Sequence, residues 1–402
     1  MIIKEPVSRK FEPTKIAIKY GKKPVLLENV EGRKVVVNLW ADRERIYREL
    51  GVDRRQFLET YIKAIAEPAP LVEGSKKFVN RISIEELPVN WYYERDAGYY
   101  ITSGIYVAEY RGKRNLSIHR TLVRNDGTGL VRLVPRDLYR MYEEAVRSGE
   151  ELKVSIVIGS PLEFLLASAT SVDYSVDESA IASSLYKLTK GKELRFSRSR
   201  NNILVPAESD IVINAKLTPK REREGPFKDV TGTYDIQENQ PQIVFEDVEV
   251  SEGWIYHSLV PATYEHFNLM GLPREPTIFK KVRERNVDII DVRLTEGGAS
   301  WLHAVVKIRK KSENDFKETV EGAFEGHKSL KRVIVVDDDI DIYDDRDIEW
   351  AEATRFQADR GIIIRRERGS SLDPSIDKDG TTAKMGINAT KPLNAGQKFN
   401  RD

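Results

Sequence analysis

Two carboxylates lie on either side of a Gly-Pro pair in the stretch EGPFKDVTGTY, residues 224–234. Glu224 directly precedes Gly225-Pro226, and Asp229 follows three residues later. Glycine and proline are common turn formers, since proline restricts φ and glycine relaxes it. The segment is either a solvated surface turn or a rigid loop that holds an acid/base pair over a substrate. General acid–base catalysis requires side chains held within hydrogen-bond reach of the reacting group.

A second candidate site lies in RNLSIHR, residues 114–120, which reads as a β-strand. Successive side chains of a strand point to opposite faces, so Asn115, Ser117 and His119 are expected on one face. Arg120 then falls on the opposite face, unless a β-bulge re-aims it. These residues are either an exposed strand end or part of a ligand site.

Two further stretches concentrate turn residues or charge. KMGINAT, residues 384–390, reads as a Lys-Met-Gly turn near the end of the chain. The acidic stretch VVDDDIDIYDD, residues 335–345, could be a calcium or magnesium site. However, it lacks the glycine and the closing glutamate of a helical calcium-binding loop. We therefore interpret the acidic run as the end of a strand.

Composition and missing motifs exclude several classes of protein. The chain has no cysteine, which excludes disulfides, thiolate nucleophiles and cysteine-bound zinc or iron–sulfur clusters. Its 5 histidines form no helical metal pair, and the HExxH, GxSxG, P-loop and GxGxxG motifs are missing. The 65 Lys and Arg nearly balance the 64 Asp and Glu, so a general nucleic-acid binder is not expected.

Hydropathy and charge suggest the surroundings of the protein. No run approaches the roughly 18 apolar residues of a membrane helix, and the N-terminal MIIKEPVSRK lacks the apolar core of a signal peptide. We expect a cytoplasmic protein with no membrane partner. Charged residues make up 32% of the chain and only 4 residues are methionine, a composition that favours a thermophilic source.

Three zones of secondary structure are expected along the 402 residues. Over residues 1–100, the apolar strands KKPVLLENV and RKVVVNLW precede the helices ADRERIYRELG and DRRQFLETYIKAIAEP, which predicts a small α/β domain. Residues 101–285 alternate with period two, which predicts a mainly antiparallel barrel or sandwich with two helical insertions, PRDLYRMYEEAVRSG and ESAIASSLYKLTKG. Residues 286–402 return to strands alternating with helices. The predicted fold class is α/β or α+β.

Taken together and in order, several of these stretches resemble the UbiD family of reversible decarboxylases. The matching motifs are ITSGIYVAEYRGKRNLSIHR, ILVPAESDIVI, EGPFKDVTGTY, WIYHSLV, RVIVVDDDIDIYDDRDIEWA and KMGINAT. Each motif is modest alone, but their shared order from about Lys23 to Thr390 makes a strong case. The resemblance implies an N-terminal α/β region, a central FMN-binding split β-barrel and a C-terminal α/β region involved in oligomerisation.

The resemblance also implies a cofactor and a reaction. Family members use prenylated FMN, which a separate flavin prenyltransferase supplies, and they release carbon dioxide from an α,β-unsaturated or aromatic acid. The organic chemistry belongs to the cofactor, while the protein supplies placement, charge and one proton. The chain is therefore expected to be a carboxy-lyase.

Three residues match the family's catalytic positions. Arg120, five residues after Asn115, matches the catalytic arginine, and Glu224 matches the glutamate that pairs with it. Asp229 matches the acid that exchanges a proton with the substrate carbon, and burial beside the flavin would favour its protonated form. The family has glycine where Lys228 stands, so Lys228 either binds an anionic substrate group or points outward.

Further matched positions concern the flavin and its ions. The family holds the flavin phosphate through a divalent ion, commonly Mn²⁺, with a K⁺ site nearby. Asn115 and Glu178 match two of the three divalent ligands, but Arg136 stands where the third, a histidine, is expected. Either Arg136 contacts the phosphate directly, or two residues and water retain the metal. The predicted cofactor-binding set is Asn115, Ser117, Ile118, His119, Arg120, Arg136, Ser168 at the K⁺ stretch, and Lys384 at the phosphate.

The substrate is predicted from the overall likeness. A short chain without cysteine resembles the archaeal members, some of which decarboxylate trans-anhydromevalonate 5-phosphate in a modified mevalonate route to isoprenoids. The runner-up is 4-hydroxybenzoate-type aromatic acid decarboxylation in quinone synthesis. Outside this class, the barrel could serve a flavin oxidoreductase, a non-catalytic flavin-binding protein or a structural subunit with a degenerate site. A homo-oligomer is expected, as in other family members.

Overall fold

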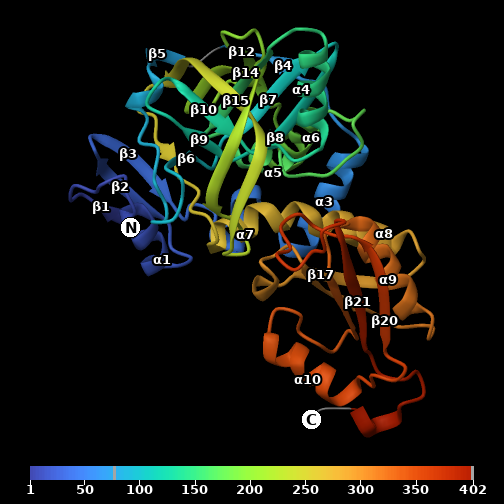
Figure 1. Ribbon diagram of the computed structural model, residues 1–402. Coiled ribbons are helices and arrows are strands. Elements are labelled where there is room, and N and C mark those ends of the chain that lie inside the picture. The colour runs from blue at the N-terminus through green and yellow to red at the C-terminus, as the bar shows by residue number, and fades with distance from the viewer. Residues whose placement is uncertain (76–77, 400–402) are drawn as a thin grey trace. The chain divides into compact units, whose positions relative to one another are not determined.

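The computed structural model describes residues 1–75 and 78–399. The chain divides into two compact units, residues 1–269 and 270–402, and Figure 1 traces their helices and strands. The first unit holds three sheets and the second holds one. The domain boundaries expected near residues 100 and 285 stay a prediction. In the described part of the chain, no helix is long and apolar enough to cross a membrane.

A small four-stranded sheet begins the first unit. Asp42 caps the helix after it by accepting from the Glu44 amide, and Asp53 with Gln56 forms a capping box for the next helix. Both helices and both strands expected here are confirmed. The sheet order is β1 (Ile2–Ile3), β2 (Val25–Val30), β3 (Arg33–Val37) and β16 (Tyr256–His257), and the helices are α1 (Glu12–Tyr20), α2 (Arg43–Leu50) and α3 (Arg54–Ala66).

A nine-stranded antiparallel sheet dominates the first unit, as the period-two pattern predicts. Its path runs through β6 (Tyr99–Ile101), β9 (Thr121–Val123), β10 (Thr128–Val131), β15 (Tyr234–Ser251), β14 (Ile211–Lys228), β11 (Leu152–Ile158), β7 (Ile105–Tyr110) and β8 (Lys113–Ile118), while β5 (Phe78–Ile82) pairs with β15. The fold class predicted from the sequence is confirmed.

The connection between β8 and β9 forces this sheet to curl (Figure 1). Strand β8 ends the path, whereas β9 lies beside β6 at the other end. Only His119 and Arg120 separate the last residue of β8 from the first residue of β9. Three Cα–Cα steps of about 3.8 Å span at most about 11 Å, so the two ends of the sheet must approach each other. Arg120 therefore lies at the seam of a curled half-barrel.

Helices and a small sheet cover parts of the half-barrel. Helices α4 (Asp137–Arg147) and α6 (Glu178–Lys190), which are the two predicted insertions, both contact β8. The buried Met141 and Tyr142 of α4 join the core that holds Tyr106 and Ile156 of the sheet. The remaining elements are α5 (Leu162–Ala167) and the strands β13 (Leu204–Pro206), β12 (Arg195–Arg198) and β4 (Val72–Glu73).

The Gly-Pro pair between the two carboxylates does not form the expected turn. It lies inside β14, where the pairing with β15 shifts register between Glu224 and Phe227. Gly225 has φ 96°, and a Cβ there would lie 2.6 Å from the Asp235 carbonyl oxygen. Glycine is therefore required for the close approach of the two strands. The prediction was wrong because turn-forming residues also build β-bulges. The actual turn follows at residues 229–233, where Asp229 N donates to Thr233 O at 2.9 Å.

The second unit is built on a five-stranded mixed sheet. Its inner pairs, β18–β19 and β19–β21, are parallel, and its outer pairs are antiparallel, so βαβ character is present in the inner strands. The order is β17 (Ile289–Leu294), β18 (His303–Ile308), β19 (Arg332–Val336), β21 (Thr381–Ala389) and β20 (Ile362–Arg368). The helices are α8 (Glu275–Arg283), α9 (Asp315–Gly326) and α10 (Asp345–Arg355), and α7 (Tyr264–Gly271) runs across the boundary between the units.

KMGINAT is a strand and not the predicted turn. It lies in β21, where a Cβ on Gly386 would come within 2.6 Å of a Val320 methyl group of α9. Glycine here allows the helix to lie close to the sheet. The acidic run begins just after β19, as expected for a strand end, and Arg355 binds Asp337 at 3.0 Å and Asp339 at 2.7 Å.

Gly129 provides a test of the packing of β10 between β9 and β15. A Cβ on this β10 residue would overlap the Leu122 carbonyl oxygen of β9 and lie 3.1 Å from Ile243. We expect Gly129→Ala to lower the free energy of unfolding by about 1–3 kcal/mol, because the added methyl group forces the strands apart. Urea unfolding measures the loss. Gly297→Ala, whose Cβ meets nothing within 4 Å, is the matched control. Equal stability of the two variants would contradict the packing.

Candidate active site

Arg120 binds three carboxylates at the seam of the half-barrel. Its Nε and Nη2 atoms donate to the two oxygens of Glu224 at 3.1 and 2.6 Å. Its Nη1 atom donates to Asp229 at 2.7 Å, and Nη2 also donates to Asp235 at 3.0 Å. The structure therefore brings together the three residues predicted as catalytic and adds a fourth, Asp235.

Irregular backbone positions these side chains. Arg120 follows the end of β8, so strand alternation no longer directs it to the face opposite His119. Glu224 directly precedes the bulge of β14, and Asp229 begins the turn into β15. The Phe227 ring centroid lies 4.8 Å from Arg120 Cζ, and the Tyr100 hydroxyl donates to Glu224 at 3.0 Å.

Burial makes the ion pairs of Arg120 mutually dependent. Burial alone would lower the pKa of Arg120, but Glu224, Asp229 and Asp235 raise it above its ordinary value. Glu224 is fully buried, and its pairing with Arg120 uses both carboxylate oxygens. Charge-assisted, bidentate pairs of this kind are among the stronger interactions in proteins. Removal of either partner would leave a buried charge without compensation.

Asp235 was missed in the sequence because its partner is distant in the chain. The hairpin register places it opposite Phe227, within reach of both Arg120 and Arg132. Arg132 Nε lies 3.4 Å from the same Asp235 oxygen that Arg120 binds. The signal that could have found Asp235 is the hairpin itself, since a residue paired with the carboxylate-flanked stretch lies beside it in space.

Asn115, Ser117 and His119 do share one face of β8 and form a chain of hydrogen bonds. Ser117 Oγ donates to Asn115 Oδ1 at 2.9 Å and lies 2.9 Å from His119 Nε2. Glu178, the first residue of α6, accepts from the Leu116 amide at 3.0 Å, and its other oxygen lies 3.5 Å from Asn115 Nδ2. Burial raises the pKa of Glu178 to about 8, and it lowers the pKa of His119 to about 4.

Two of the residues that were predicted as metal ligands lie close together. Asn115 and Glu178 lie together, as expected for two ligands of a divalent ion, and both offer the oxygen atoms that hard cations prefer. Within residues 1–75 and 78–399, no group of three His, Cys, Asp or Glu side chains could hold a metal ion. Asn115 and Glu178 therefore fit two of the protein ligands of a divalent ion.

The other predicted cofactor-binding residues lie on different elements. Ile118 ends β8, and Ser168 follows α5 with its hydroxyl bonded to the Leu165 carbonyl at 2.6 Å. Arg136 precedes α4 and lines a groove along that helix, and its guanidinium forms no ion pair within the described part of the chain. In the second unit, Lys384 is buried and its ammonium group binds the Lys328 carbonyl at 2.8 Å and Glu367 at 3.3 Å.

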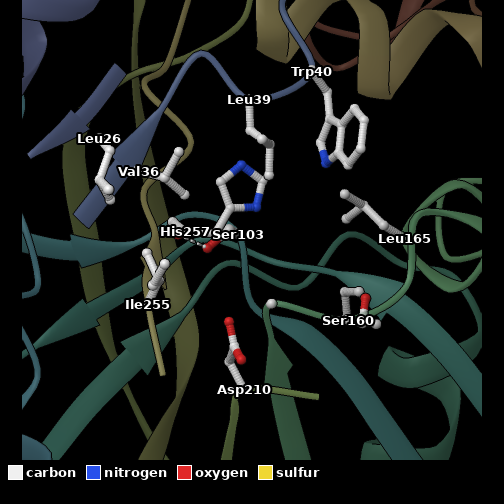
Figure 2. Close-up of a pocket in the computed structure, with 12 residues that line it drawn as sticks. Leu26, Val36, Leu39, Trp40, Ser103, Ser160, Leu165, Asp210, Ile255 and His257 are labelled. Atoms are coloured by element: carbon white, nitrogen blue, oxygen red, sulfur yellow. Dashed lines mark hydrogen bonds between the residues drawn. The ribbon is translucent and has the colours of Figure 1, made fainter. Parts of the chain in front are cut away.

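A separate cavity of about 310 Å³ lies within the first unit. Figure 2 shows the His257 ring and the Asp210 carboxylate pointing into it among apolar side chains. His257 Nε2 lies 2.8 Å from Glu265, whose same oxygen accepts from the Trp40 amide at 2.8 Å. The volume of the cavity is at the small end of the range for ligand pockets. None of its lining residues belongs to the predicted cofactor or catalytic set.

The curled half-barrel is the fold of the UbiD-class enzymes. Three domain models of this family match residues 1–264 and 267–389 of the chain. They are the 3-octaprenyl-4-hydroxybenzoate carboxy-lyase N-terminal domain (residues 1–65), Rift-related domain (63–264) and C-terminal domain (267–389). The chain belongs to the UbiD family of carboxy-lyases.

Relatives and solved structures are similar over almost the whole chain. An anhydromevalonate phosphate decarboxylase of Methanocaldococcus jannaschii is 42% identical over 98% of this chain and 95% of its own length. One from Archaeoglobus fulgidus is 44% identical over 92% and 86%. The UbiD-class enzyme HmfF from Pelotomaculum thermopropionicum, solved in complex with FMN, has a TM-score of 0.94 and 33% identity, covering 100% of this chain and 93% of its own. An evolved dimeric form of HmfF, in complex with prFMN, has a TM-score of 0.90 and 32% identity with the same coverage.

Asp96 allows the pH dependence of stability to be predicted. It accepts from the Lys228 amide at 2.9 Å and the Tyr93 amide at 3.0 Å, and burial raises its pKa from 3.8 to about 6. The folded protein thus holds this proton more tightly than the unfolded chain does. The stability from Asp96 protonation is present below about pH 4 and is lost as the pH rises through about 6, by on the order of 2–3 kcal/mol.

Urea unfolding of the wild type and Asp96→Asn at pH 4, 5, 6 and 7 measures this effect. We expect the stability of the wild type relative to the variant to decrease across that window. A difference that does not change with pH would contradict the assignment.

Proposed function

We propose that this enzyme decarboxylates trans-anhydromevalonate 5-phosphate without net oxidation and uses prenylated FMN. The observation that supports the chemistry most directly is the Arg120 cluster, in which a buried guanidinium meets three carboxylates. The names of relatives at about 40% identity over the full chain support the substrate.

Arg120 would bind and orient the substrate carboxylate. Its Nε and Nη2 atoms are held by Glu224, so Nη1, which faces Asp229, is the donor most available to an incoming anion. A substrate carboxylate at Nη1 would compete with Asp229 for the same charge. Two like charges beside one guanidinium favour a proton on one of them. Asp229 would take up that proton and deliver it to the substrate carbon after carbon dioxide leaves.

The flavin is assigned to the face of β8 that carries Asn115, Ser117 and His119. Prenylated FMN, when bound, supplies the electron sink for the loss of carbon dioxide. Asn115 and Glu178 would lie at its phosphate, with Ile118 and Ser168 as further contacts. A contact between Lys384 and the phosphate stays a prediction. A flavin prenyltransferase is the expected source of the cofactor, and a homo-oligomer stays a prediction.

The metal content of the holoenzyme distinguishes two ways of binding the flavin phosphate, either by direct contact with Arg136 or through a divalent ion. If Arg136 replaces the metal, the holoenzyme carries no stoichiometric Mn²⁺, and Arg136→His raises the metal content toward one ion per chain by restoring the histidine. Elemental analysis of both proteins measures this. Stoichiometric Mn²⁺ in the wild type would contradict direct contact between Arg136 and phosphate, and would favour retention of the ion by Asn115, Glu178 and water. Potassium content in the same analysis tests the Ser168 stretch.

Carbon dioxide release from anhydromevalonate phosphate, compared with 4-hydroxybenzoate, tests the substrate. The holoenzyme is obtained by co-expression with a flavin prenyltransferase, and the mass and spectrum of its cofactor are recorded first. We expect prenylated FMN and release from the phosphorylated acid alone. Unmodified FMN or no flavin would favour a flavin oxidoreductase or a binding protein, because these do not need the arginine–carboxylate cluster.

Two substitutions test the assigned roles. We expect Asp229→Asn to lower kcat by about 10²–10⁴-fold through loss of the proton donor. We expect Arg120→Ala to lower kcat/KM by at least about 10³-fold, because it removes the carboxylate's partner. Single-turnover assays measure both, and the flavin absorbance of each purified variant serves as the control for cofactor binding. Near-normal turnover in either flavin-loaded variant would contradict the role of that residue.

A further inference from the structure

Two cations near the turn between β14 and β15 stack on tyrosine rings. Lys228, the residue before Asp229, places its Nζ atom 4.1 Å from the centroid of the Tyr93 ring. Arg95 places its guanidinium carbon 4.4 Å from the centroid of the Tyr234 ring. Across the described residues, neither cation forms an ion pair, whereas the nearby Arg120 and Arg132 are both paired with acids.

The hairpin brings the two cations to one place. Tyr234, which lies under Arg95, is the cross-strand partner of Lys228 in the β14–β15 register. Directly opposite residues of antiparallel strands have Cβ atoms about 4.5–5.5 Å apart. Lys228 also lies near Gly232 in the turn between the strands, since a Cβ there would be 4.0 Å from its Cε atom. Both cations thus lie at the end of the hairpin that carries Asp229, on the face opposite to Phe227 and Asp235.

Main-chain bonds hold this arrangement in place. Two hydrogen bonds join the segment that carries Tyr93 and Arg95 to β14. The Ala97 amide donates to the Pro226 carbonyl at 2.8 Å, and the Asp96 carboxylate accepts from the Lys228 amide. The second oxygen of Asp96 accepts from the Tyr93 amide at 3.0 Å. The Tyr93 hydroxyl donates to the Pro261 carbonyl at 2.8 Å, which restrains the ring beneath Lys228.

The chemistry of the pair fits an anion with several oxygens. A cation stacked on an aromatic ring gains some stabilisation from it and keeps N–H groups for a ligand. Arginine binds phosphate through two parallel hydrogen bonds, and lysine adds a compact charge. Both oxygens of Asp96 accept from backbone amides, so this carboxylate mainly holds the two segments together. Burial dominates and raises the pKa of Asp96, and the Lys228 charge lowers that pKa.

We propose that Lys228 and Arg95, held on Tyr93 and Tyr234, form the subsite for the substrate's phosphate monoester. The inference rests on the proposed function and extends it, because it assigns the two anionic ends of one substrate to separate cations. The carboxylate binds Arg120, and the phosphate binds the pair on the other side of Asp229. Lys228 therefore selects phosphorylated acids over their unphosphorylated counterparts.

The test compares the holoenzyme with Lys228→Met and Arg95→Leu on two acids, the phosphorylated acid and the same acid with a free hydroxyl group. We expect the ratio of their kcat/KM values to fall by about 10- to 100-fold in each variant, as for loss of a charge-assisted hydrogen bond. Calorimetric binding of 3-methylbutyl phosphate, which has no carboxylate, is expected to weaken by a similar factor.

Two control variants sharpen this test. Lys228→Arg keeps the positive charge and is expected to keep the ratio within about threefold. Lys220→Met removes an exposed lysine of the same strand that pairs with Glu222, and it is expected to leave the ratio unchanged. An unchanged ratio in Lys228→Met and Arg95→Leu, or equal losses on both acids, would overturn the subsite while the proposed function stands. No turnover of the phosphorylated acid by the wild type would overturn both.

Discussion

The burial of one guanidinium group at the closure of the sheet is the constraint on which the rest of the site depends. Strand β8 ends the path of the sheet and β9 lies near its opposite end, so the two residues between them must bridge a seam. Arg120 is one of these residues and is almost completely buried. A buried charge is tolerated only with partners of opposite sign, and Glu224, Asp229 and Asp235 supply them. The closure of the sheet therefore brings Arg120 into the charged cluster.

The excess of negative charge around Arg120 explains how such a site could work on an acid. Glu224 is fully buried and accepts from two donors of the guanidinium, whereas Asp229 and Asp235 retain some exposure. The fully buried partner orients the arginine, and a more exposed one can be exchanged for a ligand. A substrate carboxylate would then arrive at a donor that is already oriented, which reduces the cost of ordering the site.

Sequence reasoning succeeded where the signal was local. Period-two alternation placed Asn115, Ser117 and His119 on one face, and the stretches ADRERIYRELG and DRRQFLETYIKAIAEP were correctly predicted as the helices α2 and α3. The sequence predictions were wrong where tertiary contacts determine the local conformation. The Gly-Pro pair was expected in a turn but forms a bulge, and KMGINAT was expected in a loop but forms β21, because neighbouring strands satisfy both backbones. Asp235 and Asp96 were missed, since only the closed fold brings them to Arg120 and Lys228.

A crystal structure of the prenylated-FMN holoenzyme with an unreactive saturated analogue of the phosphorylated acid tests the central claim most directly. The carboxylate of the analogue is expected to contact Arg120 Nη1 and to displace Asp229 from its 2.7 Å position, while Glu224 keeps both of its hydrogen bonds. A ligand carboxylate bound elsewhere, with the Arg120–Asp229 pair intact, would contradict the account.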